Sequence, residues 1–313
     1  MDRNLAMEFV RITEASAIEA AKMMGRGDKI LADQFATDAM RARMRAVEFS
    51  GTIIIGEGEK DEAPGLFHGE KVGCGGPEMD VAVDPLEGTT SLAQGKQNSL
   101  SVMASSPKGT MMMVPGTYMD QIATGPEAAH AIDLNASAEE NIRAIARELK
   151  KDVEEVTVVI LDRPRLQPLI DEIRKAGARI KLIDHGTVSA TIAAALPERG
   201  IDVLMGDGGA PETIIAACAL KCLGGNMFAR LKPHNEIFAE RARKMGITDF
   251  SRVYSLNELV RSQECAFAAT GITDGPLLRG VTFQHEKIRT HSLVMIGKSR
   301  TIRYMDTYHH YVR

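Results

Sequence analysis

The feature that most constrains the fold of this chain is a regular alternation of short apolar strands and helices that begins near residue 155. Runs rich in Val, Ile and Leu have the composition of buried strands, and each is followed by a segment whose apolar side chains recur at helical spacing. Parallel neighbours in a sheet need a crossover, which a helix usually supplies. Three strand–helix pairs in succession therefore predict an α/β layer with a largely parallel sheet. The pairs span residues 156–161 and 166–175, 180–183 and 187–196, and 201–205 and 213–222.

The loops after these three strands carry the polar side chains of this region. In open α/β sheets, ligands bind at the carboxyl ends of strands. Arg163 and Arg165 flank a proline after the first strand, an arrangement that suits bidentate phosphate binding, with two solvated surface charges as the alternative. The loop 206–212 is rich in glycine, so its N–H groups can form an anion-binding nest while Glu212 enters the next helix.

The rest of the chain mixes helices and strands without internal repeats or linkers. Apolar spacing predicts a helix over residues 4–24, ended by Gly25 and Gly27, and a second helix from an Asp28 N-cap to about residue 49. Tyr118 is expected in a turn-rich segment. The other expected elements are strands at 52–55, 81–83, 100–105, 111–114, 265–270, near 281, at 293–296 and near 302, a hairpin-like connection at 107–109, a helix at 137–149 with Ser137 as N-cap and Glu140 as its capping-box partner, and a helix at 236–245.

The turn Asp-Pro-Leu-Glu-Gly-Thr-Thr at residues 84–90 is the strongest candidate for chemistry. It follows an apolar, β-branched strand that the proline is expected to end, so Asp84 lies at the carboxyl end of that strand. Asp84 and Glu87 place two carboxylates three residues apart, which suits a hard cation, and Thr89 and Thr90 offer phosphate-binding donors at a helix start. The preceding strand also ends in an acidic, glycine-rich turn, which favours a shared cation site. The alternative is a plain strand–turn–helix connection with Thr89 as the helix N-cap.

Composition excludes several classes of function. The formal net charge of −4 over 313 residues argues against a general nucleic-acid binder. No apolar run is long enough for a membrane span, and the first residues lack a signal-peptide pattern. The four cysteines have no C-x-x-C spacing, which favours buried reduced thiols over a zinc site. We therefore expect a cytoplasmic protein without nucleic-acid or membrane partners.

The turn at 84–90 resembles the D-P-[IL]-[DE]-G-[TS] signature of the metal-dependent, lithium-sensitive sugar phosphatases. The chain as a whole resembles one branch of them, the class II (GlpX-type) fructose-1,6-bisphosphatases. Four further stretches match that branch in family order and span nearly the whole chain, so the resemblance is specific. They are residues 24–29 continuing to Asp33, 55–59 continuing to Pro64, 208–212 and 269–273.

The resemblance implies a role for each matching position. Thr89 matches the threonine that orients the attacking water, with Asp61 or Glu57 as proton acceptor, and Lys29 matches the phosphoryl-binding lysine, with a solvated surface lysine as the alternative. The oxygen-only ligand set suits Mg²⁺ or Mn²⁺. The metal positions are Asp33, Glu57, Asp84, Glu87, Glu212 and the Leu86 carbonyl. The substrate positions are Glu87, Gly88, Thr89, Thr90, Tyr118, Arg163, Pro164, Arg165, His185, Gly186, Thr187 and Gly209.

The implied fold is the layered α/β/α/β/α sandwich of the sugar phosphatases, formed by residues 1–313 as a single compact unit with a metal-site half (about 1–150) and an α/β half (about 151–313), and with the site between the halves. The implied activity is release of the 1-phosphate of fructose 1,6-bisphosphate, a step of gluconeogenesis, by a homo-oligomer (dimer or tetramer). One departure concerns specificity, since His185-Gly186-Thr187 stands where the family usually has Asp-Gly-Asp. Sedoheptulose 1,7-bisphosphate is therefore an alternative or additional substrate, and inositol monophosphate is a weaker candidate. A non-catalytic regulator that binds metal and phosphate is the alternative from another class.

Overall fold

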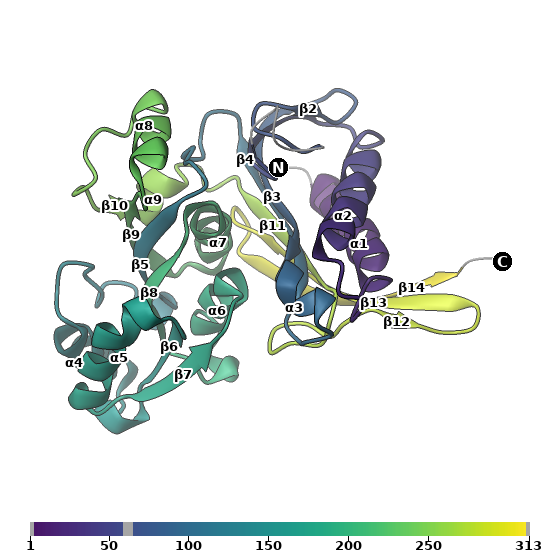
Figure 1. Ribbon diagram of the computed structural model, residues 1–313. Coiled ribbons are helices and arrows are strands. Elements are labelled where there is room, and N and C mark those ends of the chain that lie inside the picture. The colour runs from purple at the N-terminus through teal and green to yellow at the C-terminus, as the bar shows by residue number, and fades with distance from the viewer. Residues whose placement is uncertain (1–2, 59–64, 311–313) are drawn as a thin grey trace. The chain divides into compact units, whose positions relative to one another are not determined.

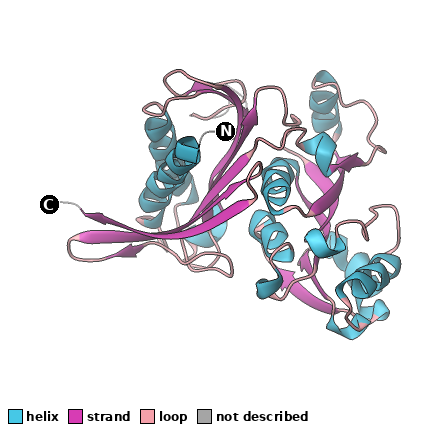
Figure 2. Cartoon of the chain, turned by 180° about the vertical axis from the view of Figure 1, so that it is seen from behind, coloured by secondary structure: helices cyan, strands magenta, loops and turns pink. Residues whose placement is uncertain are grey.

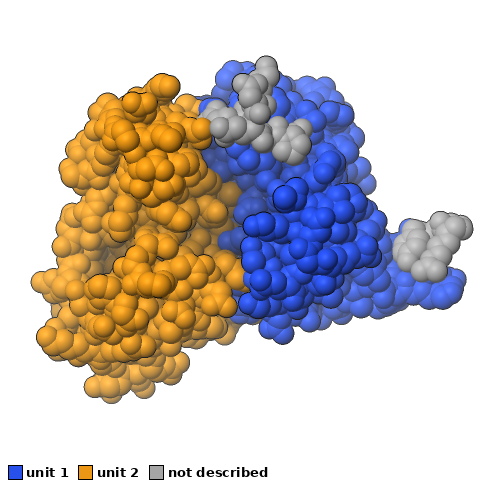
Figure 3. All heavy atoms as spheres, in the orientation of Figure 1, with its two compact units in different colours: residues 1–111, 262–313 blue, residues 112–261 orange. Residues whose placement is uncertain are grey.

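The computed structural model describes residues 3–58 and 65–310 (Figure 1). The chain divides into two compact units, which Figure 3 colours separately. Unit 1 comprises residues 1–111 and 262–313, and unit 2 comprises residues 112–261. The expected halves meet near residue 150, whereas here unit 2 begins at residue 112 and residues 262–313 return to unit 1. The expectation of a single compact phosphatase unit, and of its layer order, stays a prediction.

Unit 1 is built on an eight-stranded sheet of order β12-β13-β11-β4-β3-β1-β2, with β14 paired to β13. β1 and β3 are parallel, and the other neighbours are antiparallel. β13 and β14 form a long hairpin that extends past their neighbours (Figure 2). The strands are β1 (Ser50–Ile55), β2 (Lys71–Val72), β3 (Glu78–Glu87), β4 (Leu100–Pro107), β11 (Ala266–Gly271), β12 (Thr282–Phe283), β13 (Lys287–Ile296) and β14 (Thr301–His310).

Two helices cover this sheet, α1 (Arg3–Ala21) and α2 (Lys29–Met44). As predicted, Asp28 caps α2, and its side chain accepts a hydrogen bond from the Leu31 N–H at 3.0 Å. The helix ends at Met44, not near residue 49, because Phe49 turns into the core and packs edge-to-face on Phe9 with ring centroids 5.7 Å apart.

The prediction that Pro85 ends β3 is wrong. Asp84 pairs with Val102 and Glu87 pairs with Leu100, so the strand makes three steps against two on β4. This bulge contains Pro85, where a missing N–H costs no ladder hydrogen bond. The strand therefore continues to Glu87, and the short helix α3 (Thr89–Ala93) follows directly.

Unit 2 contains a six-stranded sheet of order β10-β9-β5-β8-β6-β7. The three predicted strand–helix pairs are confirmed, with α4 and α5 on one face of the sheet and α6 and α7 on the other (Figure 1). The elements are β5 (Tyr118–Thr124), α4 (Ala138–Leu149), β6 (Thr157–Leu161), α5 (Gln167–Ala176), β7 (Arg179–Ile183), α6 (Thr187–Ala194), β8 (Val203–Gly209), α7 (Ala210–Leu223), β9 (Asn226–Lys232), α8 (Glu236–Lys244), β10 (Tyr254–Ser255) and α9 (Leu256–Leu259), with 3-10 turns at Pro126–Ala128, Val153–Glu155, Pro164–Leu166 and Pro197–Arg199.

Three expectations that concern unit 2 are corrected, namely the largely parallel sheet, the position of Tyr118 and the strand at 111–114. Only β6, β7 and β8 run parallel, and β5, β9 and β10 are antiparallel additions, so the sheet is mixed. Tyr118 begins β5 and does not lie in a turn, because β8 and β9 pair with that segment from both sides. Residues 112–114 form no strand, and the Met112 N–H donates to the Leu259 carbonyl at 2.9 Å. The mixed, layered α/β class is confirmed in each unit. No helix within the described residues is long and apolar enough to cross a membrane.

Candidate active site

The turn between α1 and α2 is fixed to α3 by two glycine N–H groups. Gly25 donates to the Leu92 carbonyl and Gly27 donates to the Ala93 carbonyl, each at 2.9 Å. Both glycines have positive φ, +71° and +78°, which explains why the turn needs them. The start of α2, which carries Lys29 and Asp33, is thereby held beside the helix that carries Thr89 and Thr90.

Asp33 on α2 and Glu57 after β1 lie close together, so their side chains can share a hydrogen bond when one of the two carboxyl groups is protonated. Burial raises the pKa of the Asp33 carboxyl, and the bond with Glu57 partly lowers it. Glu57 is positioned by its own N–H, which donates to the Leu66 carbonyl at 3.1 Å. The preceding Gly56 allows this approach, since a Cβ there would lie 2.0 Å from the same carbonyl oxygen. A pair of acids in this arrangement favours a bound proton or a bound cation.

The bulge of β3 holds the other predicted ligands of unit 1. The Asp84 carboxylate accepts the Leu86 N–H at 3.1 Å, and Glu87 is buried with 5% of its surface exposed. The Thr89 hydroxyl donates to the Leu86 carbonyl at 3.0 Å. The predicted catalytic threonine therefore contacts the carbonyl that is predicted to bind the metal. Thr89 is not the N-cap of α3, because Gly88 occupies that position with φ of 89°.

The donor chemistry of unit 1 fits an oxygen-preferring divalent cation, since Asp33 and Glu57 share a hydrogen bond and Asp84, Leu86 and Glu87 lie in one bulge. Within the described residues, however, no group of three or more His, Cys, Asp or Glu side chains is close enough to hold a metal ion. Asp61 lies outside the described residues. Which of the predicted ligands bind a cation together stays a prediction.

In unit 2, the loop after β6 places Arg165 against the end of β8. Its Nε and Nη2 donate to the two carboxylate oxygens of Asp207, each at 2.8 Å, and its guanidinium lies 4.7 Å from the ring centroid of Tyr118. This hydrogen bonding raises the pKa of Arg165, which keeps it cationic. Sequence reasoning missed Asp207, because an aspartate between glycines looks like a turn former. The only signal was its place at the end of a predicted strand.

The companion arginine has a different role. The Arg163 guanidinium donates to the carbonyls of Asp162 and Asp184, so it ties together the loops that follow β6 and β7. Pro164 begins the 3-10 turn that leads into α5. Of the two predicted phosphate-binding arginines, Arg165 is therefore the one whose guanidinium is held by a carboxylate and an aromatic ring.

Two glycine turns complete the predicted site in unit 2. A Cβ on Gly209 would lie 2.0 Å from a carboxylate oxygen of Glu212, so that side chain covers the backbone of its own turn. Burial raises the pKa of the Glu212 carboxyl. Gly186 caps α6 with φ of 88°, so the sequence His185-Gly186-Thr187 forms the start of that helix. Thr187 is buried and packs over the Cα of Gly208, on the sheet face that carries α6 and α7.

Comparison with known proteins identifies the family. The family model described as bacterial fructose-1,6-bisphosphatase, glpX-encoded, matches residues 3–309. A protein of Synechococcus elongatus named D-fructose 1,6-bisphosphatase class 2/sedoheptulose 1,7-bisphosphatase is 43% identical over 99% of this chain and 97% of its own length. A protein of Crocosphaera subtropica with the same name is 42% identical over the same shares. The chain belongs to the glpX-type family of bacterial fructose-1,6-bisphosphatases, which are metal-dependent phosphatases.

Proposed function

We propose that the chain hydrolyses the 1-phosphate of fructose 1,6-bisphosphate, with Mg²⁺ or Mn²⁺ as cofactor, to give fructose 6-phosphate and phosphate. The observation that carries the proposal is the match to the family from residue 3 to residue 309, and the closeness of the Asp33 and Glu57 carboxyl groups supports it. These acids come from separate elements, and a divalent cation would offset the repulsion that arises when both ionise.

The ligand set of the proposal comprises Asp33, Glu57, Asp84, Glu87, the Leu86 carbonyl and, from unit 2, Glu212. When bound, the divalent cation supplies positive charge to the phosphate oxygens and lowers the pKa of a bound water. The chain itself orients the attacking water through the Thr89 hydroxyl, accepts its proton at Glu57 or Asp61, and binds the transferring phosphoryl group with Lys29. The N–H groups of Gly88, Thr89 and Thr90 are proposed to hold the same phosphate.

The distal phosphate is proposed to bind at Arg165 and Tyr118. Asp207 engages Nε and Nη2 of Arg165 and fixes the plane of the guanidinium, which leaves Nη1 for a phosphate oxygen. Arg163 and Pro164 would shape the loop, and His185, Gly186, Thr187 and Gly209 would line the sugar side. Binding energy collected at this remote group can be used to orient the reacting phosphate.

Sedoheptulose 1,7-bisphosphate is the second candidate substrate, because both relatives carry that activity in their names. His185 and Thr187 stand where the family usually has two aspartates, so contacts to the sugar differ from the usual pattern. A binding protein without catalytic activity is the candidate from another class. A homo-oligomer (dimer or tetramer) and a cytoplasmic location stay predictions, of which light scattering on the purified protein tests the first.

Phosphate release from the two sugar bisphosphates and from inositol monophosphate, each with Mg²⁺ and with Mn²⁺, tests the proposal. Fructose 1,6-bisphosphate is expected to be hydrolysed with either ion, and Glu57→Gln is expected to abolish the activity. Asp38→Asn is the matched control, because Asp38 is an exposed acid on the same helix as Asp33. The absence of release from every substrate with either metal would favour the non-catalytic alternative.

A further inference from the structure

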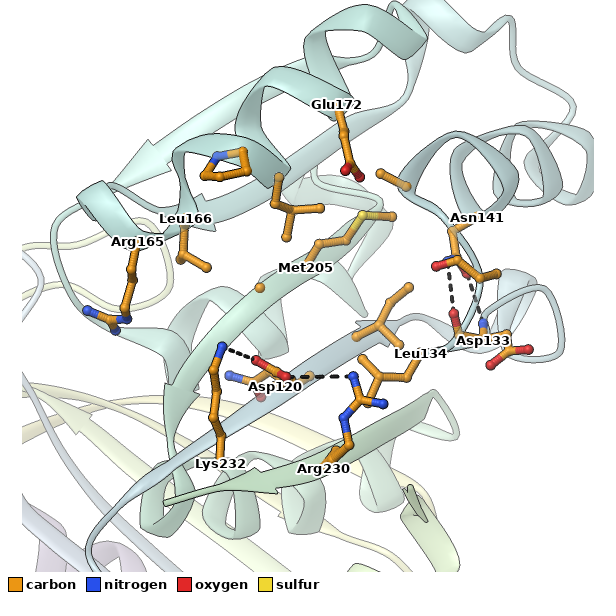
Figure 4. Close-up of a pocket in the computed structure, with 17 residues that line it drawn as sticks. Asp120, Asp133, Leu134, Asn141, Arg165, Leu166, Glu172, Met205, Arg230 and Lys232 are labelled. Atoms are coloured by element: carbon orange, nitrogen blue, oxygen red, sulfur yellow. Dashed lines mark hydrogen bonds and ion pairs between the residues drawn. The ribbon is translucent and has the colours of Figure 1, made fainter. Parts of the chain in front are cut away.

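A pocket in unit 2 has only one residue, Arg165, in common with the proposed site. Its volume is about 350 Å³, and it lies against β5, β8 and β9 on the sheet face that carries α4 and α5 (Figure 4). Sites for small organic molecules start at about this size. Most of its wall comes from residues for which the proposed reaction has no use.

One end of the pocket is cationic. Asp120 on β5 lies opposite Asp207 on β8 and Arg230 on β9 in the strand register. Lys232 Nζ is 3.0 Å from Asp120 and 3.9 Å from Asp207, Arg230 Nη2 is 3.7 Å from Asp120, and Arg165 binds Asp207. Three cations therefore surround two carboxylates, which leaves a surplus of one positive charge at this end.

The middle of the pocket is apolar and its far end is acidic. Figure 4 shows Leu134 and Met205 between the cationic group and the opposite side, where Asp133 and Glu172 lie. Asn141 fixes that far side, because its amide donates to the Asp133 carbonyl at 2.9 Å and accepts the Asp133 N–H at 2.8 Å. The larger apolar side chains along the wall are those of Ile122, Leu134, Leu166, Pro168, Leu169 and Met205.

From this arrangement we infer that the pocket binds a small organic anion with an apolar, ring-sized body. A bare inorganic anion would gain little here, because the three cations already contact carboxylates and only one positive charge is in surplus. An apolar body adds burial against the middle of the pocket, and a donor group on that body would face Glu172 at the far end. The anionic group is a phosphate or a carboxylate, whose recognition by Arg230 and Lys232 has the same chemistry.

The probe for this inference is 8-anilinonaphthalene-1-sulfonate, an apolar ring system that carries one anionic group. Its fluorescence is titrated with the full chain in the absence of metal and substrate. We expect saturable binding of one molecule per chain. Arg230→Gln is expected to weaken it about tenfold, the scale of one lost charge-assisted hydrogen bond, and Ala136→Trp is expected to abolish it by filling the pocket.

Two matched controls separate the pocket from non-specific binding. Arg143→Gln removes an equivalent charge from the exposed face of α4, and Ile237→Ala removes an exposed apolar side chain of α8, so neither is expected to change the affinity. Displacement by 1-naphthyl phosphate and by 1-naphthoate then shows which anionic group the pocket prefers.

Binding that Arg230→Gln and Ala136→Trp leave unchanged would overturn the inference, as would a failure of both naphthyl anions to displace the probe. If Ala136→Trp does not fold, the Arg230→Gln titration alone decides. Probe binding is measured without turnover, so it does not depend on the proposed function. A chain that binds the probe as expected but hydrolyses no sugar bisphosphate would contradict the proposed function and still support the inference about this pocket.

Discussion

Two pairs of carboxyl groups, one in each unit, have opposite surroundings. In unit 1, the side chains of Asp33 and Glu57 hydrogen bond to each other. In unit 2, Asp120 and Asp207 lie opposite each other across β5 and β8 but contact arginine and lysine side chains. The first arrangement gains from an added cation, whereas in the second three cations outnumber the two carboxylates and are held in place for an anion.

This difference suggests in which unit each of the two phosphate groups of a sugar bisphosphate is bound. In the proposed reaction, a bound cation adds to the charge of Lys29 at the reacting phosphate in unit 1, and the fixed guanidinium of Arg165 in unit 2 binds the distal phosphate. The same contrast predicts that removal of a carboxylate from the pair in unit 1 does not destabilise the metal-free chain. Removal of a cation from the group in unit 2 is expected to destabilise it.

Removal of divalent cations is expected to abolish phosphate release completely, because the acids of unit 1 would then repel the substrate phosphate. Addition of Mn²⁺ at about 100 times its dissociation constant should restore activity and stabilise the chain by about 2.7 kcal/mol. Phosphate release and thermal unfolding after exhaustive chelation measure both effects. Full activity in protein that elemental analysis shows to be metal-free would contradict the requirement for a divalent cation.

Thr89→Ala is expected to lower kcat by roughly 10²-fold, the scale of a lost group that positions the nucleophile. Thr89→Ser should recover much of the rate, because serine restores the hydroxyl that contacts the Leu86 carbonyl. The loss of stability should be about 1 kcal/mol, the value of the one hydrogen bond that the hydroxyl donates to the Leu86 carbonyl. Equal kcat values for the alanine and serine variants would show that the hydroxyl is not the operative group.

Arg165→Ala is expected to raise KM for fructose 1,6-bisphosphate about tenfold and to change kcat less. It should also destabilise unit 2 by about 2 kcal/mol, because the Asp207 side chain, with 1% of its surface exposed, loses both hydrogen bonds of the guanidinium. Steady-state kinetics and urea unfolding test the two parts. Arg174→Ala is the control, since that exposed arginine of α5 pairs only with Asp171 among the described contacts.

Asp33→Asn is expected to leave the metal-free chain at least as stable as the wild type, in contrast to Arg165→Ala. Burial raises the pKa of Asp33 above its ordinary value of 3.8. Its protonated form therefore stabilises the metal-free fold fully below pH 3.8, and this contribution is lost as pH rises through the raised pKa. Urea unfolding of both proteins between pH 4 and pH 7 should show a smaller pH dependence for the variant. A clear loss of stability at pH 7 would contradict the contrast between the units.

Features encoded by neighbouring residues were predictable from the sequence. Ser137 and Glu140 form the expected capping box at the start of α4, and Asp28 caps α2. These signals need no knowledge of the rest of the fold, because each is a hydrogen bond within three or four residues. The alternation of strands and helices in unit 2 was predictable for a similar reason, since each period is local.

Features that depend on distant partners were missed or known only by resemblance. The path of β3 through Pro85 depends on a bulge against β4, and the strand at Tyr118 depends on β8 and β9. Asp207 owes its role to Arg165 and to its place opposite Asp120, which no spacing rule reveals. Asp84 and Glu87 could be proposed from their own turn, whereas Asp33 and Glu212 came from the family pattern. Among the ligand positions, the structure shows the approach of Asp33 to Glu57 and the hydrogen bond from the Leu86 N–H to the Asp84 carboxylate.

The central claim is that the acids of unit 1 bind the catalytic divalent cation. The most direct measurement is a Mn²⁺ titration of the metal-free chain, followed by electron paramagnetic resonance of the free ion. We predict that Glu57→Gln loses at least one bound Mn²⁺ per chain or weakens it more than tenfold, while the exposed Asp38→Asn control binds as the wild type does. Equal Mn²⁺ binding by all three proteins would contradict the claim.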